Sequence, residues 1–262
     1  MKKNIGFIGC GKMASAIIEG AKNKYNISAS EINSELAKSA SEKLGIKVYT
    51  DNKELVKIAD IIFIATKPNQ VENVLIEIKD FVKEKLIISI AAGVTTSKIE
   101  NILDNTKIVR IMPNTPALVK LGMFGICKGK YSSEKDVEFV EEFLSAIGKC
   151  ISVTEEQMDI VTAISGSGPA FFYQVIEDMA RAGEKLGLEY EKSLILATQT
   201  AFGSAQMIFN RGETRVQTLI DNVATKGGCT FVGIEEMKNN KSSEFFYNVI
   251  EKTTKKAHEL GK

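Results

Sequence analysis

The sequence predicts an α/β protein in which a parallel sheet, covered by helices on both faces, is followed by an all-helical region. Short apolar runs alternate with helical patterns up to about residue 150, and continuous apolar runs are typical of parallel strands buried on both faces. After residue 152 the apolar spacing is helical throughout. The 262 residues, 44% of them hydrophobic, suffice for two domains, so we place them at 1–152 and 153–262.

Seven apolar runs are the expected strands of the first region. They span residues 4–9, 27–30, 47–50, 60–66, 86–92, 107–113 and 124–129. Helical patterns lie between several of them, for example at 13–23, 34–44 and 71–81, as in right-handed βαβ units. In the second region helices are expected at 157–164, 170–186, 190–210, 213–222, 231–238 and 243–259.

The charge balance limits the classes of partner. Lys and Arg number 34 against 33 Asp and Glu, which lacks the basic excess expected for a nucleic-acid or polybasic membrane role. No apolar run approaches the roughly 18 residues of a membrane span, and Gly9, Gly11 and Lys12 interrupt the first run too early for a signal peptide. We therefore expect a cytoplasmic protein that binds neither nucleic acid nor membrane. The wide apolar faces of the later helices predict a dimer.

The cysteines and the single histidine indicate no catalytic or metal site. Cys10, Cys127, Cys150 and Cys229 are far apart and form no CxxC pair, so most are expected to be small buried or half-buried packing residues, and no metal is expected. His258 lies among charges beside the apolar stripe of the last helix. We expect it to be solvated, and any proton chemistry must then proceed without histidine.

A glycine-rich turn follows the first expected strand. Residues 9–14 read Gly-Cys-Gly-Lys-Met-Ala and open a helix, which is the GxGxxA arrangement of a Rossmann-type dinucleotide-binding domain. Gly9 would permit the tight turn, Gly11 would let the backbone approach a pyrophosphate, and Ala14 would keep the helix close to the strand. The alternative is an ordinary glycine turn of an α/β protein.

Glu31 lies 20 positions after Gly11, at the end of the second expected strand. An acid there usually bonds the adenosine ribose and repels a 2′-phosphate, which favours NADH. A solvated glutamate in the first turn of the next helix is the alternative, and Ser30, Asn33 and Lys38 could still accept a phosphate. The sequence therefore leaves the choice between NADH and NADPH open.

Two further strand ends carry small or polar residues. Thr66-Lys67-Pro68 follows the fourth expected strand, and Ala91-Ala92-Gly93 follows the fifth. Open α/β sheets bind ligands at the carboxyl ends of strands, and small residues at 91–93 would let a flat nicotinamide ring lie against the backbone. Each could alone be an ordinary turn.

Gly227 and Gly228 interrupt the helical pattern within Val-Ala-Thr-Lys-Gly-Gly-Cys-Thr, residues 223–230. Stability gives no reason for them, because glycine inside a helix costs about 1 kcal/mol relative to alanine. Amides released from helical bonding can form a nest for a carboxylate, with the helix expected to restart from about residue 233. A plain interhelical turn is the alternative.

Several segments occur together in order along the chain. They are GFIGCGKMASAI (6–17), DNKE (51–54), ATKP (65–68), SIAAGVT (89–95), RIMPNTPALV (110–119), ISGSGPAFF (164–172) and DNVATKGGCT (221–230). On these the chain resembles the pyrroline-5-carboxylate reductase family over essentially its whole length. The resemblance implies hydride transfer from NADPH or NADH to 1-pyrroline-5-carboxylate, giving L-proline, the last step of proline biosynthesis. It also implies a homodimer formed by the helical domain, assembling further into a decamer, with substrate between nicotinamide and helical domain near the dimer interface.

The resemblance implies site residues by position. Cofactor contacts would come from Ile8, Gly9, Cys10, Gly11, Lys12, Met13, Glu31, Asn52, Ala65, Thr66, Lys67, Pro68, Ala91, Ala92 and Gly93. Substrate contacts would come from Glu156, Asn222, Thr225, Gly227, Gly228, Cys229 and Thr230. Thr230 would orient the imine nitrogen without acting as an obligatory acid, because an imine arrives protonated or takes a proton from water.

The chain departs from the family pattern at two positions, since Lys226 stands where a proline is usual and Cys229 where threonine or alanine is usual. Two rival functions must be compared with the reductase. A β-hydroxyacid dehydrogenase would need a lysine on the helix after the interdomain glycines, and residues 170–184 contain none. The second rival function is that of a catalytically silent nucleotide-binding regulator, which the unusual Lys226 and Cys229 leave open.

Overall fold

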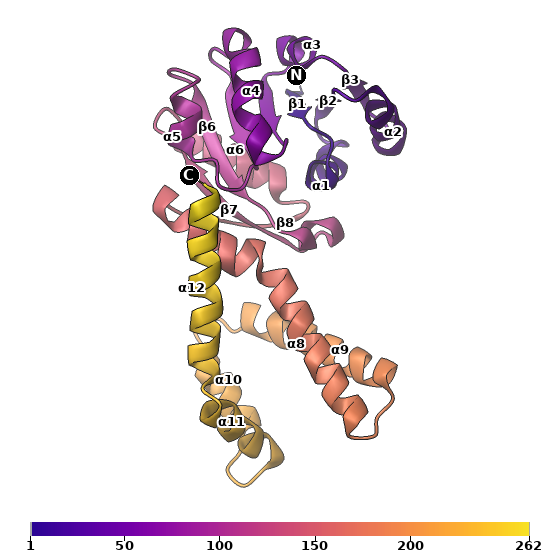
Figure 1. Cartoon of the computed structure of the whole chain (residues 1–262), viewed down its shortest axis with the longest axis vertical. Helices are drawn as coiled ribbons and strands as arrows, with labels where there is room; N and C mark the ends of the chain where they lie inside the picture. The colour runs from indigo at the N-terminus through magenta and orange to yellow at the C-terminus, as the bar shows by residue number, and fades with distance from the viewer. Residues whose placement is uncertain (1, 262) are drawn as a thin grey trace. The chain divides into compact units, whose positions relative to one another are not determined.

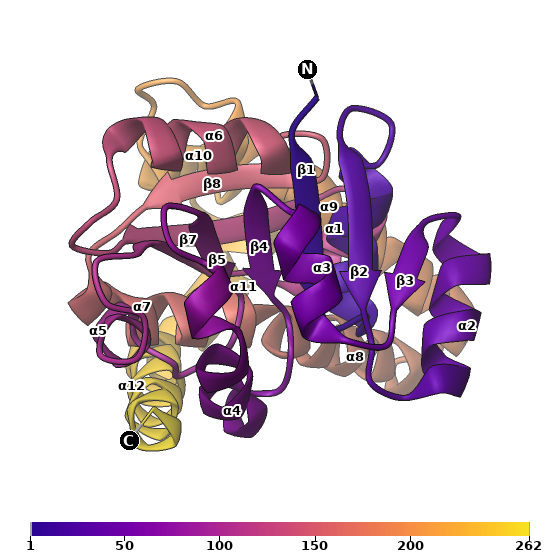
Figure 2. The same cartoon turned by 90° about the horizontal axis from the view of Figure 1, so that it is seen from above.

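The computed structural model describes residues 2–261 (Figures 1 and 2). The strands are β1 (Asn4–Ile8), β2 (Asn26–Ser30), β3 (Lys47–Tyr49), β4 (Ile61–Ile64), β5 (Leu86–Ser89), β6 (Lys107–Met112), β7 (Gly122–Lys128) and β8 (Gly148–Ser152). Helices among them are α1 (Lys12–Ala21), α2 (Ser34–Leu44), α3 (Asn52–Ile58), α4 (Pro68–Ile78), α5 (Thr96–Glu100) and α6 (Glu134–Leu144), with the 3₁₀ turns η1 (Lys79–Phe81) and η2 (Thr115–Val119). The alternation of strand and helix predicted for the first region is confirmed.

The strands form one sheet in the order β3-β2-β1-β4-β5-β6-β7-β8. Neighbours are parallel except for β6 and β7, which pair antiparallel. The expectation of a parallel sheet is therefore wrong at β7, because only residues 113–121 join it to β6 and a parallel crossover needs a dozen or more. The eighth strand was not expected either: β8 is a half-exposed edge strand without a continuous apolar run.

Two apolar layers sandwich the sheet. One contains the stacked rings of Phe7 and Phe63, whose centroids are 4.3 Å apart, and the apolar faces of α1 and α6. The other contains Leu55 from α3, Leu75 from α4 and Ile99 from α5. Figure 2 shows α1 and α3 on opposite sides of the strands. Both faces of the sheet are thus shielded from water, which explains why the central strands are unbroken apolar runs in the sequence.

The chain then becomes helical. It continues through η3 (Glu155–Gln157), α7 (Met158–Val161), the π-helical turn η4 (Thr162–Gly166), α8 (Gly168–Lys185), α9 (Tyr190–Phe209), α10 (Val216–Val223), α11 (Cys229–Asn239) and α12 (Ser242–Leu260). The chain divides into two compact units. The first contains the residues up to Ser167 together with those from Thr253, and the second, helical unit is Gly168–Lys252. Residues 153–167 and the last turns of α12 therefore pack with the sheet.

The helical unit buries little of its apolar surface. Its helices α8 and α9 lie side by side (Figure 1), and they approach closely where a Cβ on Gly183 would lie 2.4 Å from the Ser193 hydroxyl. Large side chains remain exposed, among them Phe172, Tyr173, Leu196, Phe202 and Phe209. A single copy leaves this apolar surface uncovered, as the wide apolar faces in the sequence led us to expect.

Within residues 2–261, no helix combines the length and the apolar character that crossing a bilayer requires.

Two isoleucines on α4 allow a test of the core assignment. Ile78 is fully buried, whereas Ile76 is 52% exposed. Ile78→Ala is expected to lower the free energy of unfolding by about 2–5 kcal/mol, because it leaves a cavity between helix and sheet. Ile76→Ala should change it by no more than about 0.5 kcal/mol. Equal losses in urea denaturation would contradict this packing.

Candidate functional site

The glycine turn after β1 is fixed by close backbone contacts. Gly9 has φ +100°, and a Cβ there would lie 2.8 Å from the Ala65 carbonyl oxygen, so only glycine fits. Its N–H donates to the Ser30 carbonyl at 2.9 Å. Gly11 differs, because a Cβ on it would meet no atom within 4 Å. The protein's own packing does not require glycine at position 11, so a ligand could approach the backbone closely there.

A cavity of about 400 Å³ opens beside this turn, at the carboxyl ends of β1, β2 and β4. It is lined by Ile8, Gly9, Cys10, Gly11, Ser30, Glu31, Ile32, Asn52, Ala65, Thr66, Lys67, Gln70, Asn73, Val74 and Glu77. The structure thus gathers most of the expected cofactor residues around one cavity. Lys12 and Met13 instead form the first turn of α1, whose leading amides have no partner within the helix.

One end of this cavity, which we call the Glu31 end, is acidic and internally bonded. The Ser30 hydroxyl donates to the Asn52 side-chain oxygen at 2.7 Å, and the Asn52 amide donates to the Glu77 carboxylate at 2.9 Å. Glu31 accepts from the Asn33 N–H at 3.2 Å. Of the residues that line the cavity, only Lys67 is basic. A phosphate group bound at this end would lie close to the carboxylates of Glu31 and Glu77.

Three polar lining residues on α4 were not expected from the sequence. Gln70, Asn73 and Glu77 lie three and four residues apart and so share one helix face. Their polar spacing opposite the buried residues Val71, Leu75 and Ile78 was visible in the sequence. What the sequence did not show is that this face turns toward the ends of β1 and β2.

Thr66 places an unpaired polar group in the lining of the cavity beside Gly9. Its hydroxyl is buried and has no hydrogen-bond partner in the described part of the chain, although it lines the cavity. Buried polar groups are nearly always satisfied. A polar ligand in the cavity would satisfy this hydroxyl.

A larger cavity of about 890 Å³ adjoins the loop after β5. It is lined by Lys67, Pro68, Asn69, Val71, Glu72, Leu75, Ala92, Gly93, Val94, Lys98, Asn101, Ile102 and Leu260. Lys67 lines both cavities, so the two lie next to each other. Gly93 has φ +75° and is covered by the last turn of the described chain, since a Cβ on it would lie 3.1 Å from Gly261. Ala91 is buried beneath the loop.

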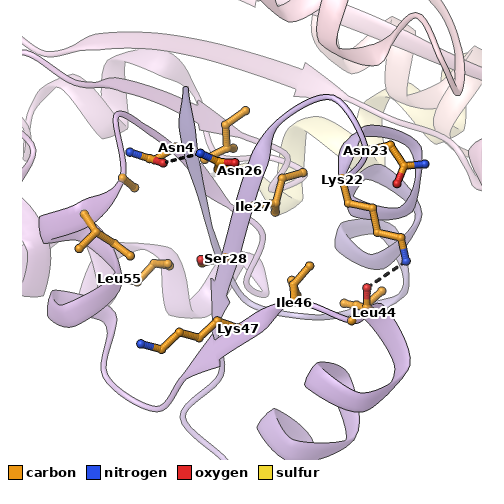
Figure 3. Close-up of a pocket in the computed structure, with 14 residues that line it drawn as sticks. Asn4, Lys22, Asn23, Asn26, Ile27, Ser28, Leu44, Ile46, Lys47 and Leu55 are labelled. Carbon is orange, nitrogen blue, oxygen red and sulfur yellow. Dashed lines mark hydrogen bonds between the residues drawn. The ribbon is translucent and has the colours of Figure 1, made fainter. Parts of the chain in front are cut away.

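A third cavity, of about 500 Å³, lies at the other end of the strands (Figure 3). Asn4, Asn26 and Lys47 begin β1, β2 and β3 around it. The Asn26 amide donates to the Asn4 side-chain oxygen at 3.2 Å, and Lys22 donates to the Leu44 carbonyl at 2.9 Å. Ligands of open α/β sheets bind at the carboxyl ends of the strands, so we do not assign a function to this cavity.

The glycine pair forms a tight turn between α10 and α11. Gly227 has φ +83°, and the Gly228 N–H donates to the Thr225 carbonyl at 2.9 Å. Our expectation that helix resumes at residue 231 or 233 is wrong, because Gly228 is extended and α11 already begins at Cys229. The first helical bond that closes on this turn runs from the Val232 N–H to the Gly228 carbonyl. The amides available for an anion are therefore those of the first turn of α11.

The remaining expected substrate residues lie on the surface of the single chain. Asn222, Thr225 and Cys229 are exposed, and Thr230 is half-buried. Glu156 is exposed, and a hydrogen bond from the Thr154 side chain lowers the pKa of its carboxyl group. Its neighbour Glu155 instead turns inward, where it pairs with Arg110. No pattern in the sequence distinguished which of the two acids would turn inward.

The two long sequence motifs meet in the first unit. The Asn114 amide of MPNTPA donates to the Ser165 hydroxyl of SGSGPA at 3.3 Å, and its oxygen accepts from the Met123 N–H. Met112 lies so close to Gly166 that a Cβ there would be 2.4 Å from its methyl group. These residues fix the course of the chain before α8.

The thiols and the histidine are placed as expected. Cys127 is buried, Cys10 and Cys150 are half-buried, and only Cys229 is exposed. Burial raises the pKa of Cys10 to about 11 and that of Cys127 to about 12, so neither thiol is nucleophilic near neutral pH. His258 is 62% exposed and faces Asp159 at 3.1 Å. Within residues 2–261, no three His, Cys, Asp or Glu side chains are grouped to hold a metal.

Comparison with known proteins gives the family. Residues 155–260 match the family model described as pyrroline-5-carboxylate reductase dimerisation, and residues 4–93 match that described as NADP oxidoreductase, coenzyme F420-dependent. The pyrroline-5-carboxylate reductase of Methanosarcina acetivorans is 39% identical, over 99% of this chain and 98% of its own. The chain belongs to the pyrroline-5-carboxylate reductase family. Pyrroline-5-carboxylate reductase 1 of Bacillus subtilis is 33% identical, over 99% and 90%.

Solved structures of this family share the fold over its full length. A pyrroline-5-carboxylate reductase from Coxiella burnetii has a TM-score of 0.93 and 34% identity and covers 100% of both chains. The Plasmodium falciparum pyrroline carboxylate reductase, solved with NADP bound, has a TM-score of 0.87 and 34% identity and covers 99% of this chain and 98% of that one. Prephenate dehydrogenase from A. aeolicus, at 13% identity and a TM-score of 0.56, shares the fold alone.

Proposed function

We propose that this protein is a pyrroline-5-carboxylate reductase, which transfers hydride from NADH or NADPH to 1-pyrroline-5-carboxylate and so produces L-proline in the last step of proline biosynthesis. The observation that carries the proposal is the 39% identity to such a reductase over 99% of the chain. That span includes both the glycine turn at residue 9 and the turn at 225–230.

The cavity beside Gly9 suits the dinucleotide. Gly11 leaves open space where the backbone can approach a pyrophosphate, and the free amides of α1 favour the anion. The unpaired Thr66 hydroxyl and the adjoining Ala91–Gly93 loop extend the lining toward the second cavity. The bound cofactor would supply the hydride. We propose that Lys12, Met13 and Pro68 complete this site.

We propose that the turn before α11 holds the substrate carboxylate. The first amides of α11 lack helical partners and carry the positive end of the helix dipole. Gly227 supplies the left-handed conformation that brings the chain into this turn. Backbone amides do not depend on the side chain at Cys229, so the unusual residue there is compatible with binding. Asn222, Thr225, Gly228 and Glu156 are proposed as further contacts.

The reduction needs little acid catalysis from the protein. Hydride adds to the carbon of the C=N bond while the nitrogen keeps or gains a proton, and the imine is basic enough to acquire that proton from water. The exposed pair of His258 and Asp159 is therefore not needed as an acid. The rate would come mainly from aligning two ligands, which can lower a barrier by about 7–11 kcal/mol. We assign the Thr230 hydroxyl to orienting the ring nitrogen.

We also propose that the helical region 153–262 forms a homodimer, and that these dimers assemble into a decamer. The match to a dimerisation family model and the exposed apolar side chains of α8 and α9 support self-association. We retain the boundary between 152 and 153 as the division between cofactor and substrate roles. A cytoplasmic location also remains a prediction.

One assay tests the function. Purified protein with NADH or NADPH should consume pyrroline-5-carboxylate, followed at the nicotinamide absorbance. It should neither reduce 3-oxo acids with these cofactors nor oxidise 3-hydroxy acids with NAD⁺ or NADP⁺. Turnover of hydroxy acids alone would instead support a β-hydroxyacid dehydrogenase. Binding of cofactor without turnover of either substrate would support a silent regulator.

Removal of the Thr230 hydroxyl tests the orienting role. Thr230→Ala should lower kcat/KM for the imine about 10- to 100-fold, since a hydrogen bond to a charged group contributes about 1.5–3 kcal/mol. The dissociation constant of the cofactor should stay within about twofold. Thr218→Ala, on the neighbouring α10, is the matched control. An unchanged kcat/KM in Thr230→Ala would remove this residue from the site.

The acidic Glu31 end should decide the cofactor. We propose that NADH is preferred, because a 2′-phosphate there would meet the carboxylates of Glu31 and Glu77, against one basic residue of the lining, Lys67. Glu31→Ser should shift the ratio of kcat/KM for NADPH over NADH upward about 10-fold. Glu35→Ser removes a nearby exposed carboxylate that does not line the cavity, and it should leave the ratio unchanged. Equal shifts in both variants would refute a local role of Glu31.

A further inference from the structure

A charged group lies buried on the sheet face that α5 covers. Arg110 of β6 is 2% exposed, and its guanidinium Nη1 donates to Oε1 of Glu155 in η3. The other terminal nitrogen, Nη2, is buried and has no partner among residues 2–261. Neutralisation of the buried guanidinium therefore depends on Glu155. Buried ion pairs seldom add net stability over well-packed apolar side chains, so this pair calls for another explanation.

The second carboxylate oxygen of Glu155 reaches a different element. Its Oε2 accepts from the Thr96 backbone N–H at 3.0 Å and from the Thr96 hydroxyl at 2.7 Å. Thr96 begins α5, three residues after Gly93 in the loop that follows β5. The same Oε2 also accepts from the Cys127 thiol of β7 at 3.8 Å. One carboxylate thus joins four places: the middle of β6, β7, the end of the Ala91–Thr95 loop, and the segment that leads into α7 and the helical unit.

The returning chain attaches to the same loop. Lys98 of α5 donates to the Gly261 carbonyl, and a Cβ on Gly93 would lie 3.1 Å from Gly261. His258 of α12 faces Asp159 of α7 at 3.1 Å. All of these contacts lie within the first compact unit. Residues 93–98 are therefore the common attachment for the two segments through which the chain passes to and from the helical unit.

We propose that Glu155, held by Arg110, is a positioning residue that fixes the Ala91–Thr95 loop for the nicotinamide half of the cofactor. This inference rests on the proposed function, in which that loop contacts the nicotinamide. The Glu155 carboxylate fits the position because each of its two oxygens is an acceptor, one for a guanidinium and one for the Thr96 N–H and hydroxyl. A glutamine has the same shape, but its NH₂ group would face either the Arg110 guanidinium or the Thr96 donors, and two donors cannot form a hydrogen bond with each other.

Glu155→Gln tests the proposal, with Glu142→Gln as the control. Glu142 pairs with Lys24 on the surface, so the control also removes one ion-paired carboxylate. Glu155→Gln should lower kcat at least 10-fold and speed amide hydrogen exchange in peptides covering residues 93–98. The dissociation constant of ADP-ribose, which lacks nicotinamide, should stay within about twofold. Glu142→Gln should change none of these quantities.

A double variant separates positioning from stability. Arg110→Met with Glu155→Leu removes both charges and should recover melting temperature lost in Glu155→Gln. Exchange at 93–98 should stay fast and kcat should stay low, because leucine cannot accept a hydrogen bond from Thr96. Recovery of kcat together with the melting temperature would show a merely structural role and overturn the proposal.

Unchanged exchange at residues 93–98 in Glu155→Gln would also overturn it. The exchange experiment does not depend on turnover. If the wild type fails to reduce the imine, the proposed function fails, and faster exchange at 93–98 in Glu155→Gln would still support the loop attachment.

Discussion

The close approach of Gly9 to the Ala65 carbonyl constrains the whole nucleotide end of the molecule. β1 lies between β2 and β4, so the chain that leaves β1 turns at the point where the strand order reverses direction. The contact with Ala65 and the bond from Gly9 to Ser30 tie the ends of these three strands together. This arrangement opens the cavity lined by Glu31, Asn52 and Thr66, because crevices form at such switch points.

Polar groups inside the first unit are few, and their partners lie far apart in the sequence. Ser30, Asn52 and Glu77 form one chain, and Arg110, Glu155 and Thr96 form another. Each chain ends beside a loop that we assign to the cofactor. Burial makes such groups costly when unpaired, so each of these loops is held in a defined position. Among the described residues of this unit, the Thr66 hydroxyl and Nη2 of Arg110 are buried without a partner, and Thr66 lines the cavity beside Gly9.

The helical unit follows a different principle. Its interior consists mainly of small residues such as Ala180, Ser193 and Ala197, while its aromatic side chains face outward. A unit built in this way depends on a second surface to cover it, which agrees with the dimerisation model that it matches. The turn at Gly227 and Gly228 is independent of that packing, because its geometry comes from a left-handed glycine and an extended one.

The sequence alone determined the features that depend on local chemistry. Unbroken apolar runs identified β1, β4, β5 and β6, glycine spacing located the turn at residue 9, and the family motifs identified the relatives. Tertiary structure decided what depends on neighbours distant in the chain. The half-exposed β8 pairs with β7, and β7 runs antiparallel to β6 because the link between them is short. Likewise Glu77 reaches the cavity beside Gly9, and Glu155 rather than Glu156 turns inward, since only the packing of α4 and η3 on the sheet gives these acids their partners.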